Sequence, residues 1–203
     1  MGCEISFEYY PMNHYEFSFT ACSLHIQEMI EFLKVEKGIL PAPQGGKYAS
    51  IKRKNQEFRT RLQTLTESQT VALLEGDLVT QRQLAYLSVC KRYAFFREFV
   101  LEVLREKVIL MDYQFTEGEY LSFYRRKLMD HPELEGLSES TEKKVKQVIF
   151  RILAEAGIIN SASEKVIQYQ LLEPKVVNLL KEDNSKWFEV FLLNDFEISN
   201  HTL

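Results

Sequence analysis

The chain has few of the residues that build disulfide scaffolds or metal sites, with three cysteines and four histidines among 203 residues. Cys3, Cys22 and Cys90 are an odd number, and they form neither a CxxC motif nor a metal-like spacing with histidine. A disulfide framework and a structural metal are therefore excluded as the basis of the fold. We expect free, mostly buried thiols in a reducing compartment.

The sequence also lacks the features of secreted and membrane proteins. No positively charged leader followed by an apolar run is present. The unbroken apolar runs are only a few residues long, far short of the ~20 residues needed to span a bilayer. We therefore expect a cytoplasmic protein that does not act at a membrane.

Catalytic signatures are missing as well. The histidines are scattered singly, and no HExxH, GxGxxG, GxxxxGK[ST] or GxSxG pattern occurs. The carboxylates are spread along expected helix faces, and spacing alone pairs none of them. We predict no catalytic residues, no metal and no cofactor, and hence a protein that is not an enzyme.

The overall charge gives no signal for a nucleic-acid partner. Apolar residues make up 45% and charged residues 27%, as in ordinary globular proteins, and the net charge is -4. Any site for a polyanion must therefore be local, because nearby charges set the field at a groove. Part of the acidic excess follows Leu172, where six carboxylates face three lysines.

The strongest pattern lies between Leu137 and Leu172. Ser138 or Ser140 can cap the start of a helix, and Gly157 follows the last periodic residue as a left-handed C-cap would. The apolar residues between them recur at helical spacing and predict one buried stripe: Val145, Val148, Ile149, Ile152, Leu153 and Ala156.

A short extended segment is expected after this helix. Ile167, Tyr169 and Leu171 alternate with Gln168 and Gln170, which predicts a half-buried strand of a small β-hairpin. A helix with a basic outer face followed by a β-ribbon is typical of the end of a winged helix-turn-helix.

The rest of the chain indicates an all-α fold. Residues 1–22 are expected to form an extended aromatic arm, with Thr20 or Ser23 capping a helix over 24–37. A heptad-like apolar spacing from 51 to 65 and a nearly continuous helical pattern over 81–110, with a break near 91–93, predict further helices. Pro174 suits the first position of a terminal helix, and the apolar residues from Trp187 to Leu192 are expected to dock on the body. Three capping boxes mark other helix starts: Thr66 with Gln69, Thr80 with Gln83, and Thr116 with Glu119.

We divide the chain into an N-terminal helical part, residues 1–112, and a winged helix-turn-helix-like part, residues 113–203. The two parts could equally form one continuous domain. In the second part, a helix over 116–129 ends before His131-Pro132, and the turn after it leads into the long helix that follows Ser138.

The outer face of that long helix is the first candidate for DNA binding. The second helix of a helix-turn-helix enters the major groove, while the preceding helix lies over the backbone. Lys143, Lys144 and Gln147 are expected in the groove, together with Ser140 near the helix start. Phosphate contacts are expected from Arg125, Arg126, Lys127 and Arg151. The alternative is a solvated helix face on which lysine is simply a good helix former.

A second basic cluster precedes residue 62. It consists of Lys52, Arg53, Lys54, Arg59 and Arg61, which do not share one face of a helical wheel. These residues are a possible secondary basic surface that contacts phosphates. The alternative is a helix whose long cationic stems cover the edges of a core and keep their charged ends in water.

The order of these blocks resembles a known family. LSESTEKKVKQVIFRILAEAGII, preceded by LREKVILMDYQFTEGEYLSFYRRKLMDHPEL and by GDLVTQRQLAYLSVCKRYAFFREFVLEV, is similar to the small helical BrxA proteins of BREX phage-defence systems. The resemblance covers roughly residues 17–180 and contains no catalytic signature. It implies a mostly helical, non-enzymatic protein with a winged-helix-like part. It also implies binding of double-stranded DNA within a multi-component defence complex.

We therefore expect a non-catalytic, double-stranded DNA-binding component of a BREX-like system, with other defence proteins as partners. The rival hypothesis is an interaction adaptor that does not contact DNA. In that case the basic helix, or an exposed patch around Trp187 and Phe191, would bind another subunit. The sequence does not indicate an oligomeric state.

Overall fold

The computed structural model describes residues 23–41, 48–130 and 137–202, and this part of the chain is mostly helical. The turn at 131–136 and the expected aromatic arm, with Thr20, lie outside the described residues. Successive elements are α1 (Ile26–Glu36), α2 (Tyr48–Leu62), α3 (Glu67–Glu75), α4 (Leu78–Arg92), α5 (Ala94–Phe99), the π-helix η1 (Val100–Arg105), α6 (Glu106–Ile109), α7 (Glu117–Asp130), α8 (Glu139–Ala156), α9 (Pro174–Asp183), the 3-10 helix η3 (Ser185–Phe191) and α10 (Asp195–Thr202).

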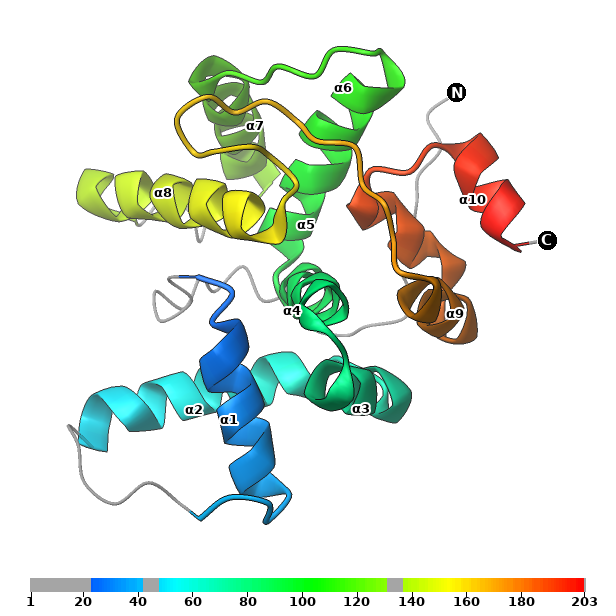
Figure 1. Cartoon of the computed structure of the whole chain (residues 1–203). Coiled ribbons are helices and arrows are strands. Elements are labelled where there is room, and N and C mark those ends of the chain that lie inside the picture. The colour runs from blue at the N-terminus through cyan, green and yellow to red at the C-terminus, as the bar shows by residue number, and fades with distance from the viewer. Residues whose placement is uncertain (1–22, 42–47, 131–136, 203) are drawn as a thin grey trace.

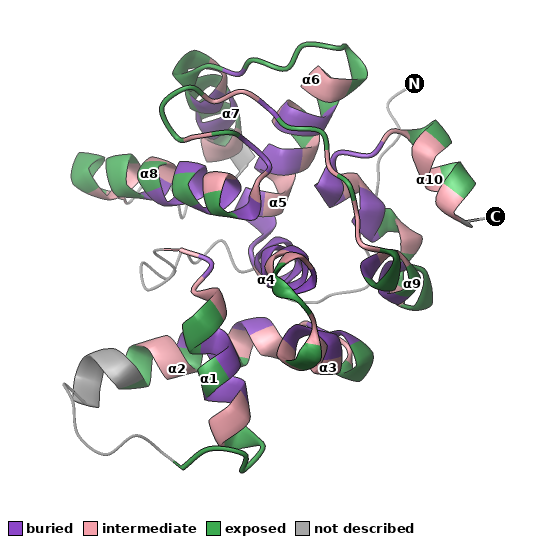
Figure 2. Cartoon of the chain, viewed as in Figure 1, coloured by how far each residue is buried: buried purple, intermediate pink, exposed green. Residues whose placement is uncertain are grey.

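Helix α4 lies at the centre of the fold. Figure 1 shows it end-on, with α1, α2 and α3 on one side and the remaining helices around the others. Its side chains from Gln83 to Lys91 are all buried, so this part of the helix is covered on every face, as Figure 2 also shows. A helix that is apolar or buried all round belongs to the core. The fold is therefore organised around α4.

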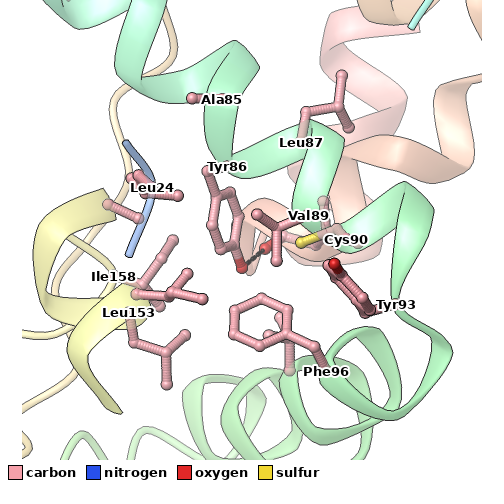
Figure 3. Close-up of a cluster of buried hydrophobic side chains, with 14 of the residues drawn as sticks. Leu24, Ala85, Tyr86, Leu87, Val89, Cys90, Tyr93, Phe96, Leu153 and Ile158 are labelled. Carbon is pink, nitrogen blue, oxygen red and sulfur yellow. Dashed lines mark hydrogen bonds between the residues drawn. The ribbon is translucent and has the colours of Figure 1, made fainter. Parts of the chain in front are cut away.

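The core beside α4 joins distant parts of the chain. In Figure 3, Tyr86 and Val89 of α4 lie among Leu24, which precedes α1, and Leu153 and Ile158 from the end of α8 and just beyond it. The Tyr86 hydroxyl donates a hydrogen bond to the backbone oxygen of Val190 in η3, 2.8 Å away. The buried aromatic ring thus packs while its polar end is satisfied.

The predicted break in the long helical segment is confirmed at Tyr93. This residue has extended φ and ψ values of -110° and 104° and separates α4 from α5. Helices α5, η1 and α6 then continue to Ile109, with a π-helical middle part.

Two of the three predicted capping boxes are present. Thr66 and Gln69 bond each other's backbone amides at the start of α3. Thr116 and Glu119 do the same before α7, at 2.6 and 3.3 Å. The third box is wrong, because Asp77 caps α4 and accepts from the Thr80 amide at 2.8 Å. For α1, the cap position is His25, with no side-chain cap hydrogen bond, so Ser23 is not the N-cap.

The C-terminal apolar stretch docks on the body, as predicted. Trp187 and Phe191 are buried rather than exposed, so the predicted adaptor patch around them does not exist. Lys91 of α4 donates to Asp183 of α9 at 2.5 Å and to Gln69 of α3 at 3.0 Å. This buried cation ties α9 to the α3–α4 pair, and hydrogen bonds of this kind are what a buried charge requires.

No named strand occurs in residues 23–41, 48–130 or 137–202, so the predicted hairpin is not present as a sheet. The described segments form two isolated antiparallel bridges, Gln114 with Val166 and Ile159 with Ile167. Ile167 is buried as predicted, but Tyr169 and Leu171 are exposed. The predicted strand alternation is therefore wrong beyond Ile167.

The proposed division near residue 112 stays a prediction. One cluster of buried side chains includes residues from both expected parts, from Leu24 to Leu193. Within the described ranges, every helix is too short or too polar to cross a bilayer.

Candidate nucleic-acid interface

Helix α8 buries one face along its length. All six residues of the predicted apolar stripe are buried, and Phe150 beside them is buried too. The Ser138 hydroxyl accepts from the Thr141 amide at 3.3 Å, which fixes the start of the helix. Gly157 ends it in the left-handed conformation, with a φ of +77°, and Ile158 folds back to bond the Leu153 oxygen. These caps confirm the predicted bounds.

The opposite face of α8 is exposed and polar. Packing of the stripe turns this face to solvent, with glutamine, serine and cationic side chains at helical spacing. Its exposed residues include Ser140, Lys143, Lys144, Gln147 and Arg151, and the exposed carboxylates Glu139 and Glu155 flank them. The structure thus brings together, on one helix face, every groove residue predicted from the sequence.

Carboxylates already contact part of this face. Lys143 forms an ion pair with Glu139 at 2.6 Å, one turn earlier on the same helix, and its side chain is 66% exposed. The hydrogen bond from Lys143 lowers the pKa of Glu139, and the same bond raises the pKa of Lys143. Pairs of this kind in water are weak, so a phosphate can replace the carboxylate.

The three predicted cations of α7 differ in their surroundings. Arg125 is exposed. Arg126 is half-exposed and pairs with Glu102 of η1 at 2.9 Å. Lys127 is only 12% exposed and pairs with Glu98 at 2.7 Å and Glu102 at 2.6 Å. The predicted basic triplet is therefore not uniformly exposed, because Arg126 and Lys127 are held by carboxylates of α5 and η1.

The surroundings of Lys127 favour a structural role. Burial opposes its charge, but hydrogen bonds to Glu102 and Glu98 more than compensate and raise its pKa. The ammonium also lies 5.5 Å from the centre of the Phe123 ring. Lys127 thus holds α7 against α5 and η1, and contact with a phosphate would break its ion pairs with Glu98 and Glu102.

Sequence reasoning missed another group of cations near α8. Lys146 of α8 pairs with Glu117 at the start of α7, at 2.6 Å. Lys165, in the segment after α8, lies 3.9 Å from the same carboxylate. These contacts join α7, α8 and the segment after α8. The available signal was that Lys146 lies seven residues before Leu153 of the predicted stripe, because this spacing places it beside the stripe on a helix.

The second basic cluster is not one surface. Arg61 is fully buried, and its Nε donates to Glu57 at 2.7 Å, while Nη1 lies 3.3 Å from the Ser23 oxygen. The Tyr93 hydroxyl donates to the same Glu57 carboxylate. The prediction that Arg61 belongs to an exposed basic surface is wrong, because α2 packs here against the start of α1 and the α4–α5 break.

The other members of this cluster reach solvent. Lys52 and Arg53 are exposed. Lys54 pairs with Glu28 at 3.4 Å, and Arg59 pairs with Glu36 at 3.1 Å, so both connect α2 to α1. Arg59 also lies over the Phe32 ring. This helix fits the alternative considered for it, in which long cationic side chains cover the edge of a core.

Metal ligands and thiols are the other reactive groups to consider among the described residues. Groups of three or more His, Cys, Asp or Glu side chains able to hold a metal are absent from this part of the chain. Cys90 is a buried free thiol in α4, and burial raises its pKa to about 12. A thiol in this state is a packing residue rather than a nucleophile.

The fold and surface define a helical protein. It presents the polar, cation-bearing face of α8, and α7 carries further basic residues. The family model of BrxA matches residues 34–184. The chain belongs to the BrxA family. It is 28% identical over 122 residues to a BREX protein BrxA of Bacillus cereus (strain H3081.97), and 24% identical over 132 residues to one of Escherichia coli O9:H4 (strain HS).

The matched segments cover 60% and 65% of this chain, and 61% and 62% of the two relatives. The matches thus span about three fifths of those curated proteins. A crystal structure of an uncharacterized protein from Magnetospirillum magneticum has the same fold, with a TM-score of 0.71 over 86% of this chain and 95% of that chain. Its sequence identity is 16%, so this likeness shows the fold alone.

Proposed function

We propose that this protein binds double-stranded DNA, without catalysis, as a component of a BREX phage-defence system. The observation that carries the proposal is the outer face of α8, where Lys143, Lys144 and Gln147 are exposed together. Cations and an amide on an accessible helix are the groups that contact phosphates and base edges. The name of the relatives, BREX protein BrxA, supports the defence context.

The order of elements supports a winged helix-turn-helix. Helices α5 to α6 are followed by the bridge at Gln114, then by α7 and α8, and then by the bridging residues Ile159 and Ile167. The Ile167 amide donates to the Tyr113 oxygen at 2.7 Å, and the Asn160 amide to the Val166 oxygen at 2.9 Å. The segment after α8 therefore contacts chain on both sides, as the wing hairpin of such a domain does.

Each helix has a separate role in this proposal. The N-terminal half of α8 enters the major groove, with Ser140, Lys143, Lys144 and Gln147 toward the bases or the nearby backbone. Arg125, Arg126 and Arg151 contact phosphates. Lys127 contributes by holding α7 in place through Glu98 and Glu102. Phosphate contacts supply most of the affinity, so the proposal includes no sequence preference.

The test is a salt titration of duplex binding by the double variant Lys143→Ala/Lys144→Ala. Both side chains are exposed, so folding should be retained. Duplex affinity should fall, and the slope of log affinity against log salt should shrink by roughly 0.9 for each phosphate that the variant no longer neutralises. Single-stranded DNA and RNA probes measured in parallel test the preference for duplex DNA.

The matched control is Lys175→Ala/Lys181→Ala, which removes the same charge from exposed positions of α9. This control should keep the wild-type slope. If Gln147 contacts a base, Gln147→Ala should weaken binding to one preferred DNA sequence by about 1–3 kcal/mol and leave the salt slope unchanged. A folded Lys143/Lys144 variant with the wild-type slope would contradict the proposal.

A further inference from the structure

The segment between Ile167 and Pro174 is an exposed stretch of extended chain. It runs from the last bridge to the start of α9, and Figure 1 shows it crossing the front of the molecule. Throughout the described part of the chain, no acceptor bonds the backbone N–H groups of residues 169–172. Unpaired backbone groups on an extended segment are a template for pairing with another strand.

The segment is held in place at both ends. Gln83 of α4 donates to the Leu171 oxygen at 2.9 Å and accepts from the Glu173 amide at 3.1 Å. Gln170 donates to the Gly157 oxygen at 2.8 Å. These bonds explain why Gln83 does not form the predicted capping box. They also fix the extended conformation in advance, which lowers the cost of binding.

The side chains that leave this segment are large and apolar. Tyr169 is 75% and Leu171 81% exposed, whereas Leu172 packs toward the core. The Tyr169 hydroxyl lies 3.2 Å from a Glu197 oxygen of α10, and Phe196 beside Glu197 is 74% exposed. Large apolar side chains as exposed as Tyr169 and Leu171, two residues apart on one segment, are uncommon where a protein has no partner. We call the side chains of Tyr169 and Leu171, together with the backbone of residues 169–172, the edge surface.

The rim of the edge surface is acidic. Glu173 follows the segment directly, and Asp195 and Glu197 begin α10. Asp195 is 93% exposed although it pairs with Arg105. Lys175 is the cation nearest in sequence to the segment. A partner with positive charge is therefore favoured over an acidic one or over DNA, because like charges placed together at an interface are costly.

We propose that the edge surface binds an extended, basic and apolar segment of a partner protein by adding a strand beside residues 169–172. Backbone hydrogen bonds to the open amides supply the register, and alternate apolar side chains pack against Tyr169 and Leu171. Lysine or arginine on the same face of the added strand, before or after these apolar side chains, meets Glu173 or Glu197, because Glu197 contacts the Tyr169 hydroxyl. The edge surface shares no residue with the proposed DNA-binding face of α8, so the two proposals can be tested separately.

The probe is a short synthetic peptide that carries lysine, valine, valine and lysine at every second position, and hence on one face of a strand, compared with a counterpart that has glutamate in place of lysine. Hydrogen exchange should be fast at residues 169–172 in the free protein, and it should slow at alternate amides of this segment in the presence of the lysine peptide, because one added strand bonds the N–H groups of one edge. The double variant Tyr169→Ala/Leu171→Ala should bind the lysine peptide roughly tenfold or more weakly, because both apolar side chains that contact the peptide are removed. The glutamate peptide should bind much more weakly.

The control is Leu121→Ala/Met129→Ala, which removes two exposed apolar side chains from α7 and should leave peptide binding unchanged. Binding of duplex DNA by the Tyr169→Ala/Leu171→Ala variant should also be unchanged. A failure of this proposal can therefore be distinguished from a failure of the DNA-binding proposal. Four outcomes would each overturn the proposal. The lysine peptide could fail to protect residues 169–172, or the glutamate peptide could bind equally well. Duplex DNA could protect these amides, or the protein could form a dimer that Leu171→Ala dissociates.

Discussion

Helices α2 and α8 carry similar numbers of basic residues but use them in different ways. On α8, Lys143 pairs with Glu139 of the same helix and remains 66% exposed. On α2, Arg61 is fully buried against Glu57, while Lys54 and Arg59 reach to carboxylates of α1. The difference shows that the elements packed against a helix, rather than its own charges, decide whether its cations are available to a ligand.

The physical reason lies in what the two helices face. The end of α2 meets the chain just before α1, where the backbone oxygens of Ser23 and Leu24 point at the Arg61 guanidinium. Arginine suits this place because it presents several donors in a rigid plane and stays charged. On the outer face of α8, Lys143, Lys144 and Arg151 are exposed, and Lys143 pairs with a carboxylate of its own helix.

The largest expected effect is on stability, at Arg61. Arg61→Ala removes one partner of a buried ion pair and leaves the Glu57 carboxylate buried beside Tyr93. Loss of one partner in such a pair costs about 3–5 kcal/mol, which urea unfolding can measure. Arg53→Ala is the control, and at this exposed site the change should stay within about 0.5 kcal/mol. Equal stability of the two variants would mean that α2 does not enter the core as described.

The next effect concerns the availability of cations near α8. Glu102→Gln releases Arg126 and leaves Lys127 paired with Glu98. Duplex affinity should therefore rise, and the salt slope should steepen by about 0.9 if the released arginine neutralises one more phosphate. Glu106→Gln, the same change at an exposed position of α6, should leave the slope unaltered. A matching rise in both variants would indicate a general charge effect instead.

The smallest effect is expected on the exposed part of α2. Lys54→Ala/Arg59→Ala breaks two exposed ion pairs, each of which contributes about 0.2–1 kcal/mol. Thermal unfolding should shift slightly, and the salt slope of duplex binding should stay at the wild-type value. A reduced slope would restore α2 as a secondary DNA surface and weaken the contrast with α8.

Much of the fold was predictable because local signals determined it. The stripe from Val145 to Ala156, the cap at Gly157 and the break at Tyr93 all depend on residues close together in the sequence. The failures came from distant partners. Asp77, rather than Thr80, caps α4. Gln83 forms hydrogen bonds with the backbone of Leu171 and Glu173, about 90 residues away in sequence.

The candidate site was predictable to the same extent. The exposed face of α8 follows from helical periodicity, so Lys143, Lys144 and Gln147 were placed together from the sequence, although their contact with DNA stays a prediction. The partners of Arg61 and Lys127 were not predictable, because Ser23 precedes Arg61 by 38 residues and Glu102 precedes Lys127 by 25. The exposure of Tyr169 and Leu171 was missed because strand alternation does not continue past Ile167.

The burial of α4 on every side has a consequence for how the protein comes apart. The amide protons of its buried turns can meet solvent only when the surrounding helices separate, so they should report global unfolding rather than local opening. Tyr86 touches the C-terminal region through Val190, while Leu153 and Ile158 approach from the other side. The two expected halves of the chain therefore share their most protected element. Under stress they should lose structure in one cooperative transition.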